Sequence, residues 1–419
     1  MSLDSPLPTG SRLATSGVPD DAPAYEGLKV VDMSQGVAGP HCGMLFALHG
    51  ADVVKVEPPD GDWGRAIGKR HGDFSAYGVA FNRGKRSLAL DLRRPEGRDL
   101  VTRLVARADV VVENNRPGVL ARYQLDYESV RRGNPDVVYV SVTGFGQEGP
   151  RRDLPATDSI LQAYSGLMTT TRDAEGTPLR IGVLVIDVVT GLYAHQAAAT
   201  ALYRRATRGG GRHVTVSLMD AIGAVQAGKM IQYHLEGDDG EPGGVPVATF
   251  QTADGHMTIN ARRDQHFVAL CGVLGEPALA VDRRYATPAA RLAHEAELMA
   301  LLRERVKAWP MAKLEAALVA ADVLHAPVND YRRYFDDSHV QATGAIAWIE
   351  HAQVGRIPLP RIPGLGQPVA GSPSARSPRV GEHTREVLGE LGLGPGAVAK
   401  LEAAGTVRAA APDAAASGS

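Results

Sequence analysis

Short apolar segments alternate with longer segments of helical periodicity along the first half of this chain. Leu28–Met33 (LKVVDM) has the composition of a buried strand. Residues 41–50 have helical character, with Pro40 near the first turn and Gly50 at the end. Asp52–Glu57 (DVVKVE) follows at once as a second strand. Two strands joined by a helix in this way predict a βαβ unit with parallel strands.

The same rhythm continues toward the middle of the chain. Residues 91–108 carry apolar side chains at helical spacing and are followed by Val110–Glu113 (VVVE), a strand candidate. Two further strand candidates are Val137–Val142 and Val214–Leu218. This alternation predicts an α/β fold: a Rossmann-like large domain with a parallel sheet covered by helices.

The pattern changes after residues 238–244 (DDGEPGG). Val247–Ile259 alternates in polarity around Asp254-Gly255, which is a strong hairpin signal, and helical patterns follow it. These features predict a smaller α+β domain. Ile357–Pro368 (IPLPRIPGLGQP) has the composition of an extended linker, and Glu382–Leu391 that of a last ordered helix.

Six segments follow from these patterns. We expect a flexible leader (1–24), the first part of the large domain (25–225), a linker (226–244), the small α+β domain (245–335), a return linker with the C-terminal part of the large domain (336–400), and a disordered tail (401–419).

Composition excludes several classes of function. The 45 basic and 47 acidic residues leave a formal net charge of −2, so the basic excess of a nucleic-acid-binding protein is absent. Cys42 and Cys271 are far apart, and the sequence holds neither CxxC nor HExxH, which argues against disulfides and a metal site. Polar, Pro-rich sequence follows Met1, so we expect no signal peptide, and no run of 18 apolar residues is present. We expect a soluble, cytoplasmic enzyme that does not bind membranes.

One glycine motif resembles a dinucleotide fingerprint. Gly144, Gly146 and Gly149 (GFGQEG) have the GxGxxG spacing after a predicted strand. The fingerprint also needs a helix that begins in the loop, and Pro150 and Pro155 in the next residues argue against one. We therefore interpret this segment as a glycine-rich turn rather than as a nicotinamide or flavin site.

Residues 178–205 (PLRIGVLVIDVVTGLYAHQAAATALYRR) carry the strongest candidate for chemistry. An apolar run ends at Asp187, and a helix is expected to begin just beyond it. An aspartate before a helix is commonly an N-cap. The helix dipole would also keep such a carboxylate ionised, as a nucleophile requires, and Gly191 would leave space for a substrate.

From about Tyr25 to Leu393 the chain resembles the class III CoA-transferases, the formyl-CoA transferase and carnitine CoA-transferase group. The resemblance rests on motifs that occur in order: GLKVVDMSQGVAGPHC (27–42), LHGADVVKVEPP (48–59), GDWGR (61–65), NRGKRSLALDL (82–92), ADVVVENNRPG (108–118), SVTGFGQEGP (141–150), DSILQAYSGLM (158–168), DVVTG (187–191) and GEHTREVLGELG (381–392).

The resemblance implies an activity and a nucleophile. Asp187 matches the family's catalytic aspartate, which would attack an acyl-CoA thioester, form an aspartyl-CoA intermediate and pass CoA to a free carboxylic acid. CoA would be a substrate, and no tightly bound cofactor is expected. The resemblance also implies a homodimer of two ring-shaped chains that interlock.

Further site residues follow from the same resemblance. The candidates for CoA binding are Val37, Ala38, Lys85, Arg86, Asn114 and Arg122. Lys85 and Arg86 could equally be a solvated strand edge. Val37 stands where relatives carry glutamine, and Ile67 where relatives often carry tryptophan, so the wall of the substrate site is expected to differ.

The sequence indicates the type of reaction more clearly than it indicates the two acids, the one carried by the CoA donor and the one that accepts CoA. The segment RIGVLVIDVVTGLYA (180–194) resembles that of members that use succinyl-CoA with dicarboxylic acceptors. Arg65 and Arg180 are candidates for acceptor binding, as are Arg262 and Arg263 for a second carboxylate. Asp158 either positions the acceptor or thiol, as catalytic support, or caps its own helix.

Two alternative functions remain. The related α-methylacyl-CoA racemases need a histidine immediately before the position of Asp158, where this chain has Thr157, which cannot act as a base near neutral pH. A CoA-binding protein without catalysis is the other alternative, and the presence of Asp187 argues against it.

Overall fold

The structure is a computed structural model that describes residues 23–173, 175–237 and 244–411. The chain forms two compact units: one extends to Gln226 and resumes at Ile346, and the other is Ala227–Ala345. Most of the predicted leader, residues 238–243 of the predicted linker, and residues 412–419 of the predicted tail lie outside the described residues.

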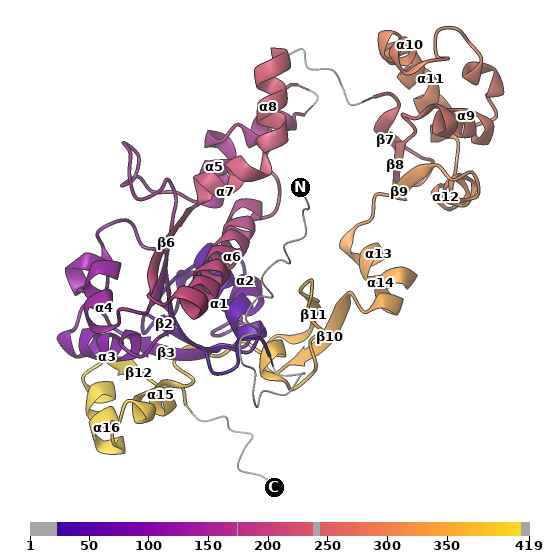
Figure 1. Ribbon diagram of the computed structural model, residues 1–419. Helices are drawn as coiled ribbons and strands as arrows, with labels where there is room; N and C mark the ends of the chain where they lie inside the picture. The colour runs from indigo at the N-terminus through magenta and orange to yellow at the C-terminus, as the bar shows by residue number, and fades with distance from the viewer. Residues whose placement is uncertain (1–22, 174, 238–243, 412–419) are drawn as a thin grey trace, which may run out of the picture. The chain divides into compact units, whose positions relative to one another are not determined.

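A seven-stranded sheet forms the centre of the first unit (Figure 1). Its strand order is β12-β3-β2-β1-β4-β5-β6, and every neighbouring pair is parallel except β12 with β3. The order 3-2-1-4-5-6 is that of dinucleotide-binding folds, so the prediction of a large parallel sheet is confirmed. The strands are β1 (Lys29–Asp32), β2 (Asp52–Glu57), β3 (Arg86–Leu90), β4 (Val110–Glu113), β5 (Val138–Thr143), β6 (Arg212–Ser217) and β12 (Val407–Arg408).

Helices cover both faces of this sheet. Successive strand residues point to opposite faces, so Val30 and Val31 of β1 belong to two separate buried clusters. The helices on the Val30 face are α1 (Ala38–Leu48), α5 (Asp158–Tyr164), α6 (Val185–Arg208) and α7 (Leu218–Val225), and those on the Val31 face are α3 (Pro95–Val105), α4 (Tyr127–Gly133), α15 (Thr384–Glu390) and α16 (Pro395–Ala403). The short α2 (Ala76–Phe81) lies between β2 and β3 in the sequence.

The C-terminal part of the chain is more regular than the sequence predicts. Part of the predicted linker 357–368 is strand β11 (Gly355–Pro360), which pairs antiparallel with β10 (Ile346–His351) because Ile349 and Leu359 are buried against Phe74. The prediction of disorder from residue 401 is wrong up to residue 411. α16 continues to Ala403, and β12 pairs with β3 while Val407 is buried.

The second unit has its own core. A three-stranded antiparallel sheet contains β7 (Val247–Gln251), β8 (His256–Asn260) and β9 (Leu324–Pro327), and its first two strands form the hairpin predicted at Asp254-Gly255. The helices of this unit are α8 (Ala227–Glu236), α9 (Asp264–Val273), α10 (Pro288–Ala293), α11 (Glu295–Lys307), α12 (Met311–Ala320), α13 (Tyr331–Asp336) and α14 (Ser338–Thr343). Among the described residues of both units, no helix is long and apolar enough to cross a bilayer.

Candidate active site

A cavity of about 400 Å³ opens where the strand order of the large sheet reverses. The chain leaves β1 and β4, which are neighbours, in opposite directions, and ligands of open α/β sheets bind at the carboxyl ends of such strands. The residues that line the cavity are Gln35, Val37, Ala38, Trp63, Asn114, Asn115, Arg116, Pro117, Val142, Thr143, Gly144, Arg152, Leu154, Pro155, Ala156, Thr157, Asp187 and Leu218. Four predicted site residues are therefore brought together: Val37, Ala38, Asn114 and Asp187.

The loop between β1 and α1 is held by three side chains: one on β2, one in the loop after β2 and one directly after β4. The Asn114 amide accepts the N–H of Gln35 at 2.8 Å, and its Nδ2 donates to the Gln35 carbonyl at 2.6 Å. Asp62 Oδ1 accepts the N–H of Gly36 at 2.7 Å, and Lys55 Nζ donates to the Ser34 carbonyl. The polar atoms of Asn114 thus hold the loop that faces the cavity.

Asp187 is the third residue of α6, whose N-cap is Leu184. The prediction of an N-cap is therefore wrong, because the helix begins three residues earlier than expected. Asp158, the first residue of α5, supplies the cap: its Oδ2 accepts the N–H of Ile186 at 2.7 Å and of Asp187 at 3.2 Å. Asp158 therefore does not cap its own helix; it holds the first turn of the helix that carries Asp187.

The electrostatic environment of Asp187 differs from the sequence-based expectation. Burial raises the pKa of its carboxyl to about 7, and the negative charge of Asp158 contributes. The carboxylate of Asp158 accepts the N–H groups of Ile186 and Asp187, so these two donors do not stabilise the charge of the Asp187 carboxylate. Asp187 therefore titrates near neutral pH, which is where perturbed groups at functional sites are often found.

Gly191 brings two helices close together rather than leaving space for a substrate. A Cβ atom at this position would lie 2.7 Å from the Ala38 carbonyl oxygen and 2.7 Å from Cβ of His41. His41 Nδ1 lies 3.0 Å from the carbonyl oxygen of Val188. The missing side chain thus lets α1 pack against α6 and sets Ala38 beside the turn that carries Asp187.

Lys85 and Arg86 do not reach the cavity. Lys85 is 4% exposed, and its Nζ binds Asp32 Oδ2 at 2.8 Å and the Pro40 carbonyl at 2.7 Å. Arg86 forms ion pairs with Asp52, Glu386 and Glu390. Neither cation is available to a phosphate in this structure, and the solvated-edge interpretation of Lys85 is wrong too, because its ammonium is buried.

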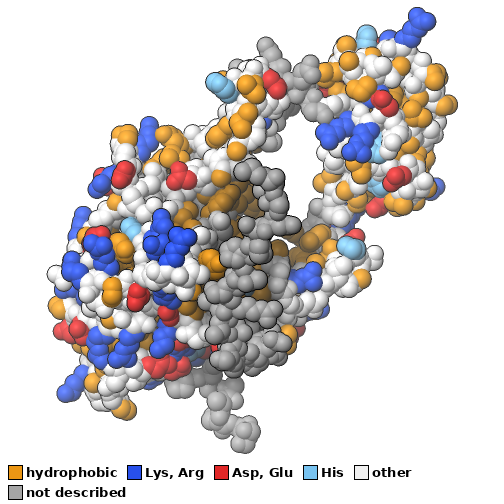
Figure 2. Space-filling model, in the orientation of Figure 1, with side chains coloured by type: hydrophobic (Ala, Val, Ile, Leu, Met, Phe, Trp, Pro, Cys, Tyr) orange, Lys and Arg blue, Asp and Glu red, His pale blue; other side chains and the backbone are white. Residues whose placement is uncertain are grey.

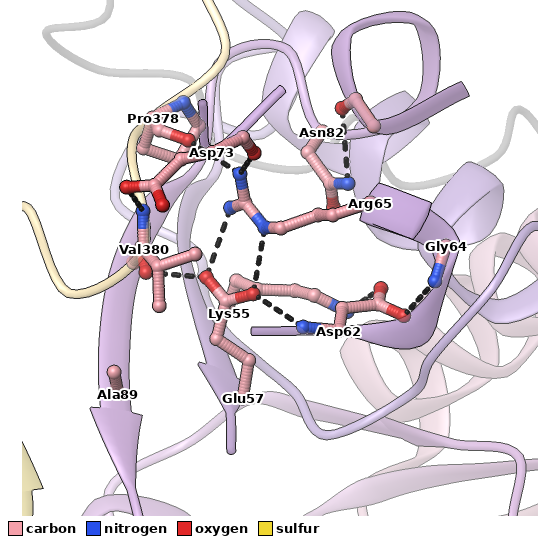
Figure 3. Close-up of polar contacts among 12 residues, drawn as sticks. Lys55, Glu57, Asp62, Gly64, Arg65, Asp73, Asn82, Ala89, Pro378 and Val380 are labelled. Atoms are coloured by element: carbon pink, nitrogen blue, oxygen red, sulfur yellow. Dashed lines mark hydrogen bonds and ion pairs between the residues drawn. The ribbon is translucent and has the colours of Figure 1, made fainter. Parts of the chain in front are cut away.

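Arg65 is also bound within the protein rather than directed into the cavity (Figure 3). It is 1% exposed, forms two hydrogen bonds with Glu57 at 2.8 and 2.9 Å, and donates to the Pro378 carbonyl at 2.9 Å. Arg180 is exposed and does not line the cavity; Arg122 is exposed on the short helix Leu120–Tyr123. Arg262 and Arg263 are exposed in the second unit.

The sequence interpretation missed three residues that line the cavity, and it did not predict the environment of Arg83, which is buried and does not line the cavity. Trp63, Arg116 and Arg152 line the cavity, and the GDWGR and NNRPG motifs already marked the places of the first two. Arg83 is 3% exposed, and within the described part of the chain its Nε has no hydrogen-bond partner and its guanidinium no ion pair. No sequence signal predicts an unpaired buried arginine, because burial is a tertiary property.

The rejected glycine motif behaves as expected. No helix begins in the loop at Gly144–Gly149, and the next helix is α5 at Asp158. A Cβ atom at Gly144 would lie 2.1 Å from Cβ of Ala156, so this turn is a close contact at the cavity wall. Thr157, at the position where a racemase needs histidine, also lines the cavity. Among the described residues there is no group of His, Cys, Asp and Glu that could hold a metal ion.

Known proteins resemble this chain over nearly its whole length. Residues 25–384 match CoA-transferase family III. The chain is 38% identical to succinate–glutarate CoA-transferase of Agrobacterium fabrum, over 89% of this chain and 97% of that protein. It is 35% identical to succinyl-CoA:mesaconate CoA-transferase of Haloarcula hispanica, over 89% and 98%.

The fold comparison agrees. A crystal structure of a CaiB/BaiF family protein from Brucella suis superposes with a TM-score of 0.78 at 38% identity, covering 87% of this chain and 98% of that one. Family match, relatives and fold lead to one conclusion: this chain is a member of CoA-transferase family III.

Proposed function

We propose that this enzyme moves CoA from succinyl-CoA to a short dicarboxylic acid, with Asp187 as the nucleophile. The observation that carries the proposal is that Asp187, Val37, Ala38 and Asn114 line one cavity at the switch point of the sheet. An aspartate with a pKa of about 7 at the start of α6 supports the role of nucleophile, because it is desolvated yet ionises at neutral pH.

The covalent steps balance without a metal or redox partner. The Asp187 carboxylate attacks the thioester carbonyl of succinyl-CoA, and the C–S bond breaks. CoA departs as a thiolate, and a mixed anhydride between succinate and Asp187 remains. The thiolate attacks the Asp187 carbonyl carbon and releases succinate, which leaves an aspartyl thioester. The acceptor carboxylate then attacks this thioester, and the displaced thiolate takes the acceptor's acyl group and frees Asp187.

The start of α1 supplies groups that could stabilise each oxyanion. The first N–H groups of a helix have no intrahelical partner, and α1 begins at Ala38, which lines the cavity. The preceding loop is held by Asn114, Asp62 and Lys55, so these donors need little reorganisation during the reaction. We assign the oxyanion contact to the N–H of Ala38. Arg122 and Arg116 are the proposed contacts for the phosphates of CoA.

The acid pair is proposed from the relatives and from one cation. The relatives are named for succinyl-CoA, succinate, glutarate and mesaconate. Burial lowers the pKa of His41 to about 4, and the charges of Lys85 and Arg83 contribute, so Arg83 lies in the same region as the His41–Val188 contact beside Asp187. An unpaired buried charge costs several kcal/mol. We propose that the second carboxylate of the substrate offsets this cost by pairing with Arg83.

Mass spectrometry tests the reaction. The protein is incubated with succinyl-CoA and a panel of mono- and dicarboxylic acids, and new thioesters are identified by mass. Asp187→Asn should abolish transfer, and hydroxylamine should trap Asp187 during turnover. If deuterium from the solvent enters the α-position of a 2-methylacyl-CoA, the enzyme is a racemase; if CoA binds and nothing reacts, it is a binding protein.

Arg83→Ala tests the dicarboxylate assignment. We expect KM for glutarate to rise about 10- to 100-fold, because a hydrogen bond between charged groups is lost. KM for a monocarboxylate should change little. Arg180→Ala is the matched control, since Arg180 is exposed whereas Arg83 is buried. Equal effects of Arg83→Ala on mono- and dicarboxylates would remove Arg83 from the proposal while leaving Asp187 in place.

We also propose the interlocked homodimer that the family resemblance implies. Large apolar side chains are exposed over α5, α6 and α7, where Figure 2 shows orange side chains, and a soluble monomer rarely leaves such a patch uncovered. The residues are Ile160, Tyr164, Leu192, Tyr193, Met219 and Val225. The dimer should persist at nanomolar concentration by sedimentation, whereas a folded, active monomer on dilution would contradict interlocking.

A further inference from the structure

Trp63 is unusually exposed for a residue in such a rigid place. Its side chain is 54% exposed and lines the cavity together with Asp187. The residue begins the short helix Trp63–Ala66, directly after Asp62. Large aromatic side chains that face a ligand cavity supply contact area at a small cost in side-chain entropy.

Two glycines allow the indole to pack closely against the backbone. A Cβ atom at Gly36 would lie 2.2 Å from Cζ2 of Trp63, so the ring packs directly on the backbone of Gly36. Gly36 has a φ of +83°, and a Cβ atom at Gly64 would lie 2.6 Å from the Gly36 carbonyl oxygen. One side of the indole is therefore fixed against the loop, and the ring remains accessible on the cavity side.

A buried ionic network holds the backbone on both sides of Trp63 (Figure 3). Asp62 Oδ1 accepts the N–H of Gly64 at 2.8 Å, and the N–H of Asp62 donates to Glu57 Oε2 at 2.9 Å. Lys55 pairs with Asp62 Oδ2 at 2.8 Å, and Arg65 pairs with Glu57. All four charged side chains are at most 2% exposed. Buried ion pairs add little net stability, so their rigid geometry is the more important property here.

The indole and Asp187 line the same cavity. Gly36, on which it packs, precedes Val37 and Ala38, and the Ala38 carbonyl contacts the Gly191 position one turn beyond Asp187. These contacts connect the cavity wall formed by Trp63 with α6, the helix that carries Asp187. Arg116 and Arg152 line the same cavity from the loops after β4 and β5.

We propose that Trp63 is a specificity-determining residue of the acyl site. Its indole packs against the carbon chain of the acyl group bound to CoA and limits the length and branching of the acid that the site accepts. The proposal rests on the proposed CoA-transferase function, because it assigns the wall of that same site. The acids that fit are short and unbranched, and bulkier acids are excluded by the fixed ring.

Fluorescence tests the contact independently of turnover. Succinyl-CoA is titrated into the wild type, Trp63→Phe and Trp348→Phe, the last being a matched control because Trp348 is 42% exposed, stacks with Arg356 and does not line the cavity. We expect a saturable change of tryptophan emission in the wild type and in Trp348→Phe, and none in Trp63→Phe. A full change in Trp63→Phe would overturn the contact.

Selectivity tests the consequence. With succinyl-CoA as donor, adipate and phenylsuccinate are compared with glutarate as acceptors, and Trp63→Ala should raise the ratio of kcat/KM for the bulky to the small acid about tenfold. A merely structural role would lower all values together and leave the ratio unchanged, which would overturn the proposal. If no acid accepts CoA in the wild type, the proposed function fails, and the fluorescence result still decides whether Trp63 contacts the ligand.

Discussion

Asp187→Asn should stabilise the protein at alkaline pH while it abolishes catalysis. The substitution keeps the shape of the side chain and removes a charge that the native site disfavours. The pKa of Asp187 is raised from its ordinary value of 3.8 to about 7, so the folded state binds a proton more tightly than the unfolded state does. Wild-type stability should therefore fall as the pH rises from about 4 to about 7, and the Asp187→Asn variant, which is neutral at this position, should escape this loss.

The magnitude follows from the pKa. Each unit corresponds to about 1.4 kcal/mol, so the ionised carboxylate costs about 4 kcal/mol above pH 7 and about 1.6 kcal/mol at pH 5. The advantage of Asp187→Asn should thus grow by about 2–3 kcal/mol between pH 5 and pH 8. At roughly 2 °C for each kcal/mol, the midpoint of thermal unfolding should diverge by several degrees.

Thermal unfolding of both proteins at pH 5, 6, 7 and 8 measures this divergence. Asp99→Asn is the control, because Asp99 is an exposed carboxylate on α3 of the same unit. The control should show no comparable divergence. A constant difference between Asp187→Asn and wild type over this range would refute the reasoning, since it would mean that Asp187 is ionised throughout.

Three other substitutions probe the neighbours of the proposed nucleophile. The acid limb of the kcat/KM profile should lie near pH 7, where Asp187 loses its proton; Asp158→Asn should move it to lower pH, because one negative charge is gone while burial remains. Gly191→Ala should lower the free energy of unfolding by about 1–3 kcal/mol, as measured by urea denaturation, because the added methyl group would clash with α1 and push this helix away from α6. Asn114→Asp should lower kcat about tenfold in steady-state assays, because its second oxygen would repel the Gln35 carbonyl and release the loop.

The local parts of this fold could be predicted because they depend on short patterns. The strands Asp52–Glu57 and Val110–Glu113 have the predicted bounds, since an apolar run between polar residues marks a buried parallel strand. The hairpin at Asp254-Gly255 follows from the turn chemistry alone. Strand β11 was missed because its two prolines resemble a linker, although a two-stranded ribbon tolerates proline at its edge.

Of the residues at the site, only those within recognisable sequence motifs could be predicted. Asp187, Val37, Ala38 and Asn114 carry motif positions, and they line one cavity. The role of Asp158 depends on hydrogen bonds across 28 and 29 residues of sequence, which no local pattern encodes. Lys85 and Arg65 have the charge expected of a ligand-binding residue, yet both are buried against acidic partners. Charge alone does not distinguish a cation that binds substrate from one that stabilises the interior.

The network around Arg65 also constrains the order of events during synthesis. Arg65 donates to the carbonyl of Pro378, and the N–H of Gly381 donates to Ser87, so the N-terminal strands depend on contacts that are about 300 residues away. The ribosome must first produce residues 227–345, which takes roughly 6–24 s at typical elongation rates. During that interval Arg65 and Ser87 lack their C-terminal partners Pro378 and Gly381, and the nascent sheet has an open edge at β3. Chaperone contact with this edge on the growing chain is the expected consequence.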